Sequence, residues 1–306
     1  MSLSSSVPAA PLLSVIVVAA DSGPGLRDCV RSVLAWSIPL ELLLVDNASS
    51  DGVPEAVNRA WEHDSRVRVI YNHSNLGFGE AVNRGVAQAH GDTLLVLNPD
   101  CIVDETGARR LLEALGSATD IGLVGAIVCD AQGVPDPASW RRDPLLRRAL
   151  NSLLGRARDG INVAGPLPDH LVNAEVVSGA LMLMPHEVFK RVGGFDPGYF
   201  LHCEDLDLCR RVRDAGLRVL LAGHVRVLHA KGGSSAHRQV FVSQHKHRGM
   251  WRWFRKFDPA ARNPVLAGLV WAGIWVHFVV QVPGQWTRQY AHRGMRATSA
   301  DARRDK

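Results

Sequence analysis

Three carboxylates crowd into four positions of the segment HCEDLDLCRR, residues 202–211. They belong to Glu204, Asp205 and Asp207. Like charges held this close raise one another's proton affinity and cost stability, so their presence calls for a reason. The glycine-rich turn GGFDPGYF precedes them, and the apolar spacing of 206, 209 and 212 indicates that a helix begins near Glu204.

Negative charge is favoured at the first turn of such a helix, where free N–H groups and the helix dipole stabilise it. Helix capping explains one or two of the carboxylates but leaves a third. The same field keeps a carboxylate ionised at neutral pH, as a general base must be, and we predict that Asp205 is this base. The competing interpretation, a zinc site of His202, Cys203 and Cys209, matches no usual spacing of zinc ligands.

Two more residues with useful chemistry follow predicted strands. Asp100 comes two residues after the run LLVLN, with Pro99 holding the turn, and His229 ends the run VRVLH before a glycine pair. Each also has a structural interpretation: Asp100 as a cap of the helix starting near Asp104, and His229 as a structural side chain. We expect Asp100, Asp205 and His229 to meet in one pocket at the edge of a sheet.

The elements that would position these residues alternate between short apolar runs and longer helical patterns. Predicted strands span 14–18, 40–46, 67–71 and 93–98, with helices over 25–36, 53–63 and 78–89 between them. A helix over 105–116, strands over 121–129 and 176–185 and a short helix over 186–192 follow. Unbroken apolar strands separated by amphipathic stretches predict an α/β fold with a doubly wound sheet covered on both faces. Ligands bind at the carboxyl ends of the strands in such sheets.

Composition divides the chain into an acidic body and a basic tail. Of the net charge of +5, residues 243–306 carry twelve Lys/Arg and three Asp, or +9, which leaves about −4 on the rest. This pattern is typical of a protein with one end on an anionic surface. Five cysteines without a CxxC motif favour a reducing, cytoplasmic setting. The first apolar stretch, 12–20, lacks preceding basic residues and is predicted as a strand rather than a signal peptide.

Six ordered motifs resemble the glycosyltransferase family 2 enzymes of the GT-A fold, particularly their bacterial rhamnosyltransferase-like branch. The motifs are LLLVDNASSDG, NLGFGEAVNRGV, LLVLNPDC, VVSGALMLMP, VGGFDPGYFLHCEDLDLCRRVRDAG and VLHAKGGSS, and the resemblance covers roughly residues 13–257. It implies a mixed sheet with a nucleotide-binding half and an acceptor half. It also implies an inverting enzyme that moves a sugar, here expected to be rhamnose, from a nucleotide-diphosphate donor with the help of Mg²⁺ or Mn²⁺.

The resemblance also implies a role for each matching residue. Asp100 and His229 would hold the metal, and Asp205 would be the base. The donor side would comprise Asp46, Asn47, Gly77, Gly79, Asn83 and Asn98. The acceptor side would comprise Gly179, Ala180 and Glu204. Asn98 stands where many members carry a first metal-binding aspartate, which is a mark of the rhamnosyltransferase-like branch.

The tail combines a basic and aromatic stretch, HKHRGMWRWFRKF (245–257), with an apolar run over 265–282 that is interrupted by His277 and Gln281. At about 1.5 Å per residue this run reaches ~27 Å, close to the ~30 Å of a hydrocarbon core. RNA binding, a membrane span, a re-entrant hairpin, an in-plane anchor and a helix packed on the body are all compatible with it. Basic residues on both sides favour a helix held at the cytoplasmic face of the membrane, with an anionic surface rather than nucleic acid as the partner.

We therefore predict four regions. Residues 1–12 form a disordered N-terminus, and 13–242 form the catalytic domain, in which 130–170 is a lid or acceptor-binding segment. Membrane-associating helices occupy 243–285, and 286–306 form a disordered basic tail. The predicted function is sugar transfer to a lipid-linked or saccharide acceptor in cell-surface polysaccharide synthesis. The alternatives are a sugar-nucleotide nucleotidyltransferase and a non-catalytic membrane or RNA adaptor.

Overall fold

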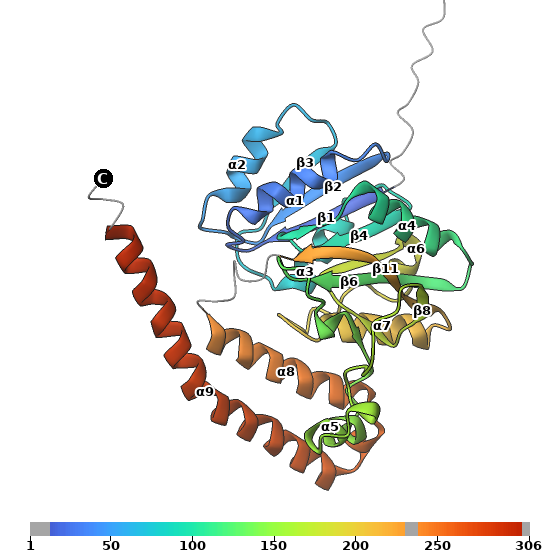
Figure 1. Ribbon diagram of the computed structural model, residues 1–306, viewed down its shortest axis with the longest axis vertical. Helices are drawn as coiled ribbons and strands as arrows, with labels where there is room; N and C mark the ends of the chain where they lie inside the picture. The colour runs from blue at the N-terminus through green and yellow to red at the C-terminus, as the bar shows by residue number, and fades with distance from the viewer. Residues whose placement is uncertain (1–12, 230–237, 302–306) are drawn as a thin grey trace, which may run out of the picture.

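The computed structural model describes residues 13–229 and 238–301 and consists of a sheet with helices on both faces and two C-terminal helices (Figure 1). Within these ranges nine strands form one mixed sheet in the order β3-β2-β1-β4-β10-β6-β11-β5, with β8 also beside β11. The first four strands in the chain are parallel: β1 (Leu13–Ala19), β2 (Leu40–Asp46), β3 (Val67–Tyr71) and β4 (Thr93–Leu97). The expected doubly wound half is confirmed.

The second half of the sheet contains strands that run in both directions. It consists of β10 (Leu181–Pro185), β6 (Ile121–Cys129), β11 (Arg218–His229), β5 (Cys101–Ile102) and β8 (Leu171–Asn173). β10 lies antiparallel between β4 and β6 and so joins the two halves. The predicted strand over 176–185 is divided, because 178–180 leave the sheet and β9 (Val176–Val177) pairs instead with β7 (Trp140–Arg141).

The helices divide between the two faces of the sheet. One apolar core lies under α1 (Gly25–Leu34), α2 (Val53–Ala60) and α4 (Glu105–Gly116). The other lies under α3 (Phe78–Val86), α6 (His186–Arg191) and α7 (Glu204–Asp214). Each predicted helix is present, although α1, α2 and α3 end two or three residues earlier than predicted.

The segment 130–170 is more ordered than a simple loop. It contains β7, short 3₁₀ turns at Pro137–Ser139 and Ala157–Asp159, and the helix α5 (Leu146–Leu153). Charged contacts fix it to the body: Arg148 donates to Glu175 at 2.6 and 2.8 Å, and Asp143 accepts from Arg210 and Arg213 of α7. The segment is therefore tethered to the helix that carries the acidic pair.

The C-terminal region forms α8 (Gln239–Phe257), a 3₁₀ turn (Pro259–Arg262) and α9 (Pro264–Asp301). α8 packs on the α7 side of the body through the buried Trp253, and α9 turns back along α8 (Figure 1). α9 continues to Asp301, through most of the segment predicted as a disordered basic tail, and the disorder of 286–306 stays a prediction. The predicted disorder of 1–12 and of 302–306 falls outside the described residues.

Candidate active site

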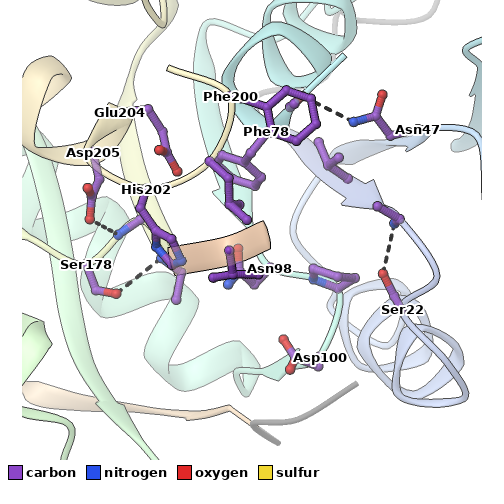
Figure 2. Close-up of a pocket in the computed structure, with 18 of the residues that line it drawn as sticks. Ser22, Asn47, Phe78, Asn98, Asp100, Ser178, Phe200, His202, Glu204 and Asp205 are labelled. Atoms are coloured by element: carbon purple, nitrogen blue, oxygen red, sulfur yellow. Dashed lines mark hydrogen bonds between the residues drawn. The ribbon is translucent and has the colours of Figure 1, made fainter. Parts of the chain in front are cut away.

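A cavity of about 530 Å³ opens at the carboxyl ends of β1, β2 and β4, against the start of α7 and the end of β11 (Figure 2). The residues predicted from far-separated motifs, Asp100, Asp205 and His229, all line it. Its wall also contains other predicted site residues, namely Asn47, Gly77, Asn98, Gly179, Ala180 and Glu204. The expected convergence on one pocket is therefore present.

Asp100 and His229 are brought together by a short ladder that the sequence did not reveal. β5 runs antiparallel to the end of β11 and pairs Cys101 with His229. The Asp100 carboxylate is then 2.9 Å from His229 Nε2, and the two side chains are 16% and 18% exposed. The Asn98 amide lies 3.4 Å from the same ring nitrogen.

Asp100 and His229 offer one oxygen and one nitrogen ligand for a divalent metal ion. Within the described residues, Asp100, Cys101 and His229 form the group whose ligand atoms all lie within 4.8 Å of one another. Burial raises the pKa of the Cys101 thiol well above its ordinary value, so the thiol stays protonated and is a poor ligand. One carboxylate and one imidazole therefore remain; the carboxylate oxygen suits Mg²⁺ or Mn²⁺, and the imidazole nitrogen is a ligand that a transition metal such as Mn²⁺ accepts more readily than Mg²⁺ does.

The acidic pair lies on the opposite wall, at the first turn of α7. His202 and Cys203 precede it with left-handed φ angles of 67° and 71°, which few residues other than glycine adopt. This backbone turns Glu204 and Asp205 toward the cavity, as Figure 2 shows. Such strained positions cluster at functional sites.

Asp205 is held by three donors. Its Oδ2 accepts from Arg141 Nη2 at 2.6 Å and from the Gly179 N–H at 3.2 Å, and its Oδ1 accepts from the Leu206 N–H at 2.8 Å. Burial acts to raise the pKa of Asp205, but the charge and hydrogen bond of Arg141 outweigh it and keep that pKa below its usual range. Asp205 is therefore ionised, as a base requires.

The pKa of Glu204 is shifted in the opposite direction to that of Asp205. Burial, and then the charge of Asp205, raise the pKa of Glu204 to about 8. In the described part of the chain its Oε2 has no hydrogen-bond partner, although the side chain points into the cavity (Figure 2). Adjacent carboxyls with pKa values moved in opposite directions can take different chemical roles.

The third carboxylate, Asp207, is fully buried and faces away from the cavity. It accepts from Lys256 Nζ at 2.6 Å and from Arg211. It therefore ties α7 to α8, and this structural role explains why the segment contains a third acid.

Three predicted donor-side residues lie outside the cavity wall. Asp46 accepts from the Ser49 N–H at 2.9 Å and stabilises the turn after β2. Asn83 binds the backbone of Phe195 with both ends of its amide, at 2.8 and 2.9 Å. A Cβ at Gly79 would lie 2.9 Å from Phe195 Cβ. Asn83 and Gly79 thus hold the 193–200 turn rather than reaching the cavity.

Gly77 and Asn47 join that turn to the cavity wall. Gly77 has φ +85°, and a Cβ there would lie 2.4 Å from the Phe200 carbonyl oxygen. The buried Asn47 donates to Asn75 and to the Gly77 carbonyl, and accepts from the Leu76 N–H at 3.0 Å. The glycine-rich loop is therefore fixed in place before any ligand binds.

Arg141 is the functional side chain that the sequence interpretation missed. It comes from β7, lines the cavity and bonds to Asp205. Among the described residues its Nε has no partner. The excess of arginine in 141–158 was the available signal, but nothing in the sequence indicates which arginine faces the acidic pair.

The zinc interpretation does not fit this arrangement. Burial raises the pKa values of the Cys203 and Cys209 thiols, the latter to about 12, and lowers the pKa of His202 to about 4. His202 is therefore a neutral lining residue, and both cysteines belong to the apolar core.

The fold and the site define a GT-A glycosyltransferase. The mannosyltransferase PcManGT from Pyrobaculum calidifontis, solved in complex with GDP-Man and Mn²⁺, has a similar fold with a TM-score of 0.59 and 18% identity, over 96% of this chain and 81% of that one. GalNAc-T7, solved with UDP, GalNAc and Mn²⁺, gives a TM-score of 0.58 and 15% identity, over 86% of this chain and 54% of that one.

The chain belongs to glycosyl transferase family 2, whose profile matches residues 14–166. It is 30% identical over 271 residues to the N-acetylglucosaminyl-diphospho-decaprenol L-rhamnosyltransferase of Mycobacterium tuberculosis, covering 79% of this chain and 87% of that protein. Rhamnosyltransferase WbbL of Escherichia coli is 29% identical, over 62% of this chain and 72% of that protein. The predicted family and its rhamnosyltransferase-like branch are confirmed, and the nucleotidyltransferase and adaptor alternatives fall away.

Proposed function

We propose that this glycosyltransferase moves rhamnose, with inversion, from a nucleotide-diphosphate sugar to a lipid-linked or saccharide acceptor in cell-surface polysaccharide synthesis. The observation that carries the proposal is that the Asp100–His229 pair and the Glu204–Asp205 pair face one cavity. The names of the two relatives support the choice of sugar, and the name of the mycobacterial one supports a lipid diphosphate acceptor.

The donor would lie between the glycine-rich loop and the metal pair. Asn47, Gly77 and Asn98 line this side of the cavity, and Asp100 and His229 would hold Mg²⁺ or Mn²⁺. A bound divalent cation would neutralise the negative charge that develops on the leaving diphosphate. We assign Asp46, Gly79 and Asn83 to the support of this side rather than to direct contact with the donor.

The acceptor would approach the opposite wall, formed by Gly179, Ala180 and the acidic pair. Asp205, kept ionised by Arg141, accepts the proton of the acceptor hydroxyl as that oxygen attacks the sugar. Single displacement needs no protein nucleophile, which agrees with one ionised carboxylate on this wall. Glu204, with its raised pKa, retains a proton at neutral pH and donates a hydrogen bond to an acceptor oxygen.

Attachment to the cytoplasmic face of the membrane, in a peripheral or monotopic manner, completes the proposal. Pro264–Gly284 within α9 is long and apolar enough to cross a membrane, and little of it is buried. Trp271 is 50% exposed, Val276 62% and Val280 72%. A membrane-borne acceptor would then be presented to the cavity from the surface on which the enzyme is held.

The test is transfer from a set of nucleotide sugars to a lipid diphosphate saccharide, with Mn²⁺, with Mg²⁺ and with a chelator. We expect rhamnose to be transferred only when metal is present, and Asp205→Asn to reduce turnover by about 10²–10⁴ while donor binding stays near normal. Asp100→Asn should weaken metal-dependent donor binding. Asp28→Asn is the control, because Asp28 lies on the exposed side of α1 and pairs with Arg31. Ordinary turnover in Asp205→Asn would reassign the base, and turnover without metal would remove the role of Asp100 and His229.

A further inference from the structure

The helix α5 presents an apolar face that the described part of the chain leaves uncovered. Leu150, Leu153 and Leu154, at its end, are 49%, 81% and 66% exposed. Together with Leu146 they recur at intervals of four, three and one, which places them on one side of a helix. None of the eight residues of α5 is buried. Exposed apolar stripes of this kind mark interaction surfaces.

A hydrogen bond fixes α5 beside the start of α9. The Leu146 N–H donates to Asp258 Oδ2 at 2.6 Å, and Asp258 Oδ1 accepts from the Ala260 N–H at 2.8 Å. Asp258 thus caps α5 and the turn that leads into α9, and Figure 1 shows α5 next to this turn. Val265 and Leu269, 68% and 65% exposed, begin the apolar side of α9 at the same end of the molecule.

The charges around the stripe indicate what covers it. Residues 145–159 contain four arginines and one acidic residue, Asp159, so the charge around the leucines is positive. Arg148 is bound to Glu175, whereas Arg147, Arg156 and Arg158 are exposed. A symmetric contact between two copies would bring these arginines against their own counterparts. An anionic phospholipid surface offers both phosphates for the arginines and an apolar interior for the leucines.

We propose that α5 is a second membrane-contact element, in which Leu150, Leu153 and Leu154 enter the interface of an anionic leaflet. The proposal rests on the membrane attachment proposed for α9 and extends it to the catalytic body. Arg141 lies in the same tethered segment, five residues before α5 begins. Docking through α5 therefore holds the Arg141 side of the cavity close to the leaflet, where a lipid-linked acceptor would arrive.

The test places an environment-sensitive fluorophore on α5 in the full chain. All five native cysteines are buried, so a new surface cysteine can be labelled selectively. Leu153→Cys reports on α5, Val276→Cys on α9, and the exposed Glu113→Cys on α4 is the control. Vesicles of phosphatidylglycerol and phosphatidylethanolamine should shift the emission of the label at 153 to the blue and leave that at 113 unchanged, and phosphatidylcholine vesicles should have a much smaller effect.

A second measurement uses the unlabelled variant Leu150→Gln/Leu153→Gln/Leu154→Gln. Its vesicle partition coefficient should fall about tenfold or more, because the variant lacks the three apolar side chains whose transfer from water into the membrane favours binding. Its transfer to a water-soluble acceptor should match that of the wild type.

Three outcomes would overturn the proposal. A blue shift at 276 without one at 153 would mean that α9 docks alone, and membrane attachment would still stand. No shift at either position would remove both membrane proposals. A shift at 153 that depends on protein concentration without vesicles would identify a second copy of the chain as the occupant of this face.

Discussion

Replacing Arg141 by methionine should move the acidic limb of the pH–activity profile upward. Arg141 Nη2 lies 2.6 Å from Asp205 Oδ2, and the side chains are 18% and 13% exposed. Opposite charges ~4 Å apart interact by about 4 kcal/mol at an effective dielectric constant of about 20, which corresponds to about 3 pH units. Water entering the vacated space reduces this value, so we expect a shift of about 1–3 units.

The upward direction of the pH shift follows from the groups that remain around Asp205 when Arg141 is replaced. Burial acts to raise its pKa, and Arg141 now keeps that pKa below the usual range. Without the guanidinium, burial is no longer outweighed by that charge, and Asp205 takes up a proton at a higher pH. Because only the ionised form accepts a proton, kcat/KM should fall first at the acidic end and recover at higher pH.

The assay is the pH dependence of kcat/KM at saturating metal, with thermal unfolding of each variant to confirm folding. Arg141→Lys keeps the charge and should give a smaller shift. Arg142→Met is the matched control, because Arg142 donates to the carbonyls of Gly160 and Asn162 rather than to a carboxylate. A folded Arg141→Met enzyme with an unmoved acidic limb would refute the role of this pair.

Two further substitutions, at Glu204 and at Gly77, test how residues of the cavity wall affect the stability of the fold. The folded-state pKa of Glu204, about 8, lies above its ordinary 4.5, so the stability gained from the protonated form is present below 4.5 and lost as pH rises through 8. Glu204→Gln should remove this loss. The free energy of unfolding in urea should then differ less between acidic and alkaline pH than it does in the wild type. An equal difference in both proteins would mean that Glu204 is not protonated in the folded state. Gly77→Ala should lower the free energy of unfolding by about 1–3 kcal/mol, because φ is +85° and the new Cβ would meet Phe200. In Gly116→Ala nothing lies within 4 Å of the new Cβ, so that variant should stay near wild type, and similar losses in both would point to a general effect of alanine.

The sequence predicted the local elements well because apolar runs such as LELLLVD report burial directly. It predicted the edge on which Asp100, Asp205 and His229 meet because parallel strands share one carboxyl end. It missed β5, whose two residues are too short for any periodicity, and with it the pairing that sets His229 beside Asp100.

The roles of other residues near the site depend on tertiary contacts, which the sequence does not show. Nothing in the spacing of Gly79 and Asn83 distinguishes a residue that touches a ligand from one that supports the 193–200 turn. Arg141 is one of several arginines in its segment, and only the pairing of β7 with β9 selects it to face Asp205.

The position of β10 has a consequence for how the protein is made. β10 is synthesised more than fifty residues after β6, yet it lies between β4 and β6 and pairs with both. During synthesis, β4 has no strand partner on the side that β10 will occupy until Pro185 has left the ribosome. A gene cut between the two halves would therefore yield two fragments that each lack a finished sheet, rather than two independent domains.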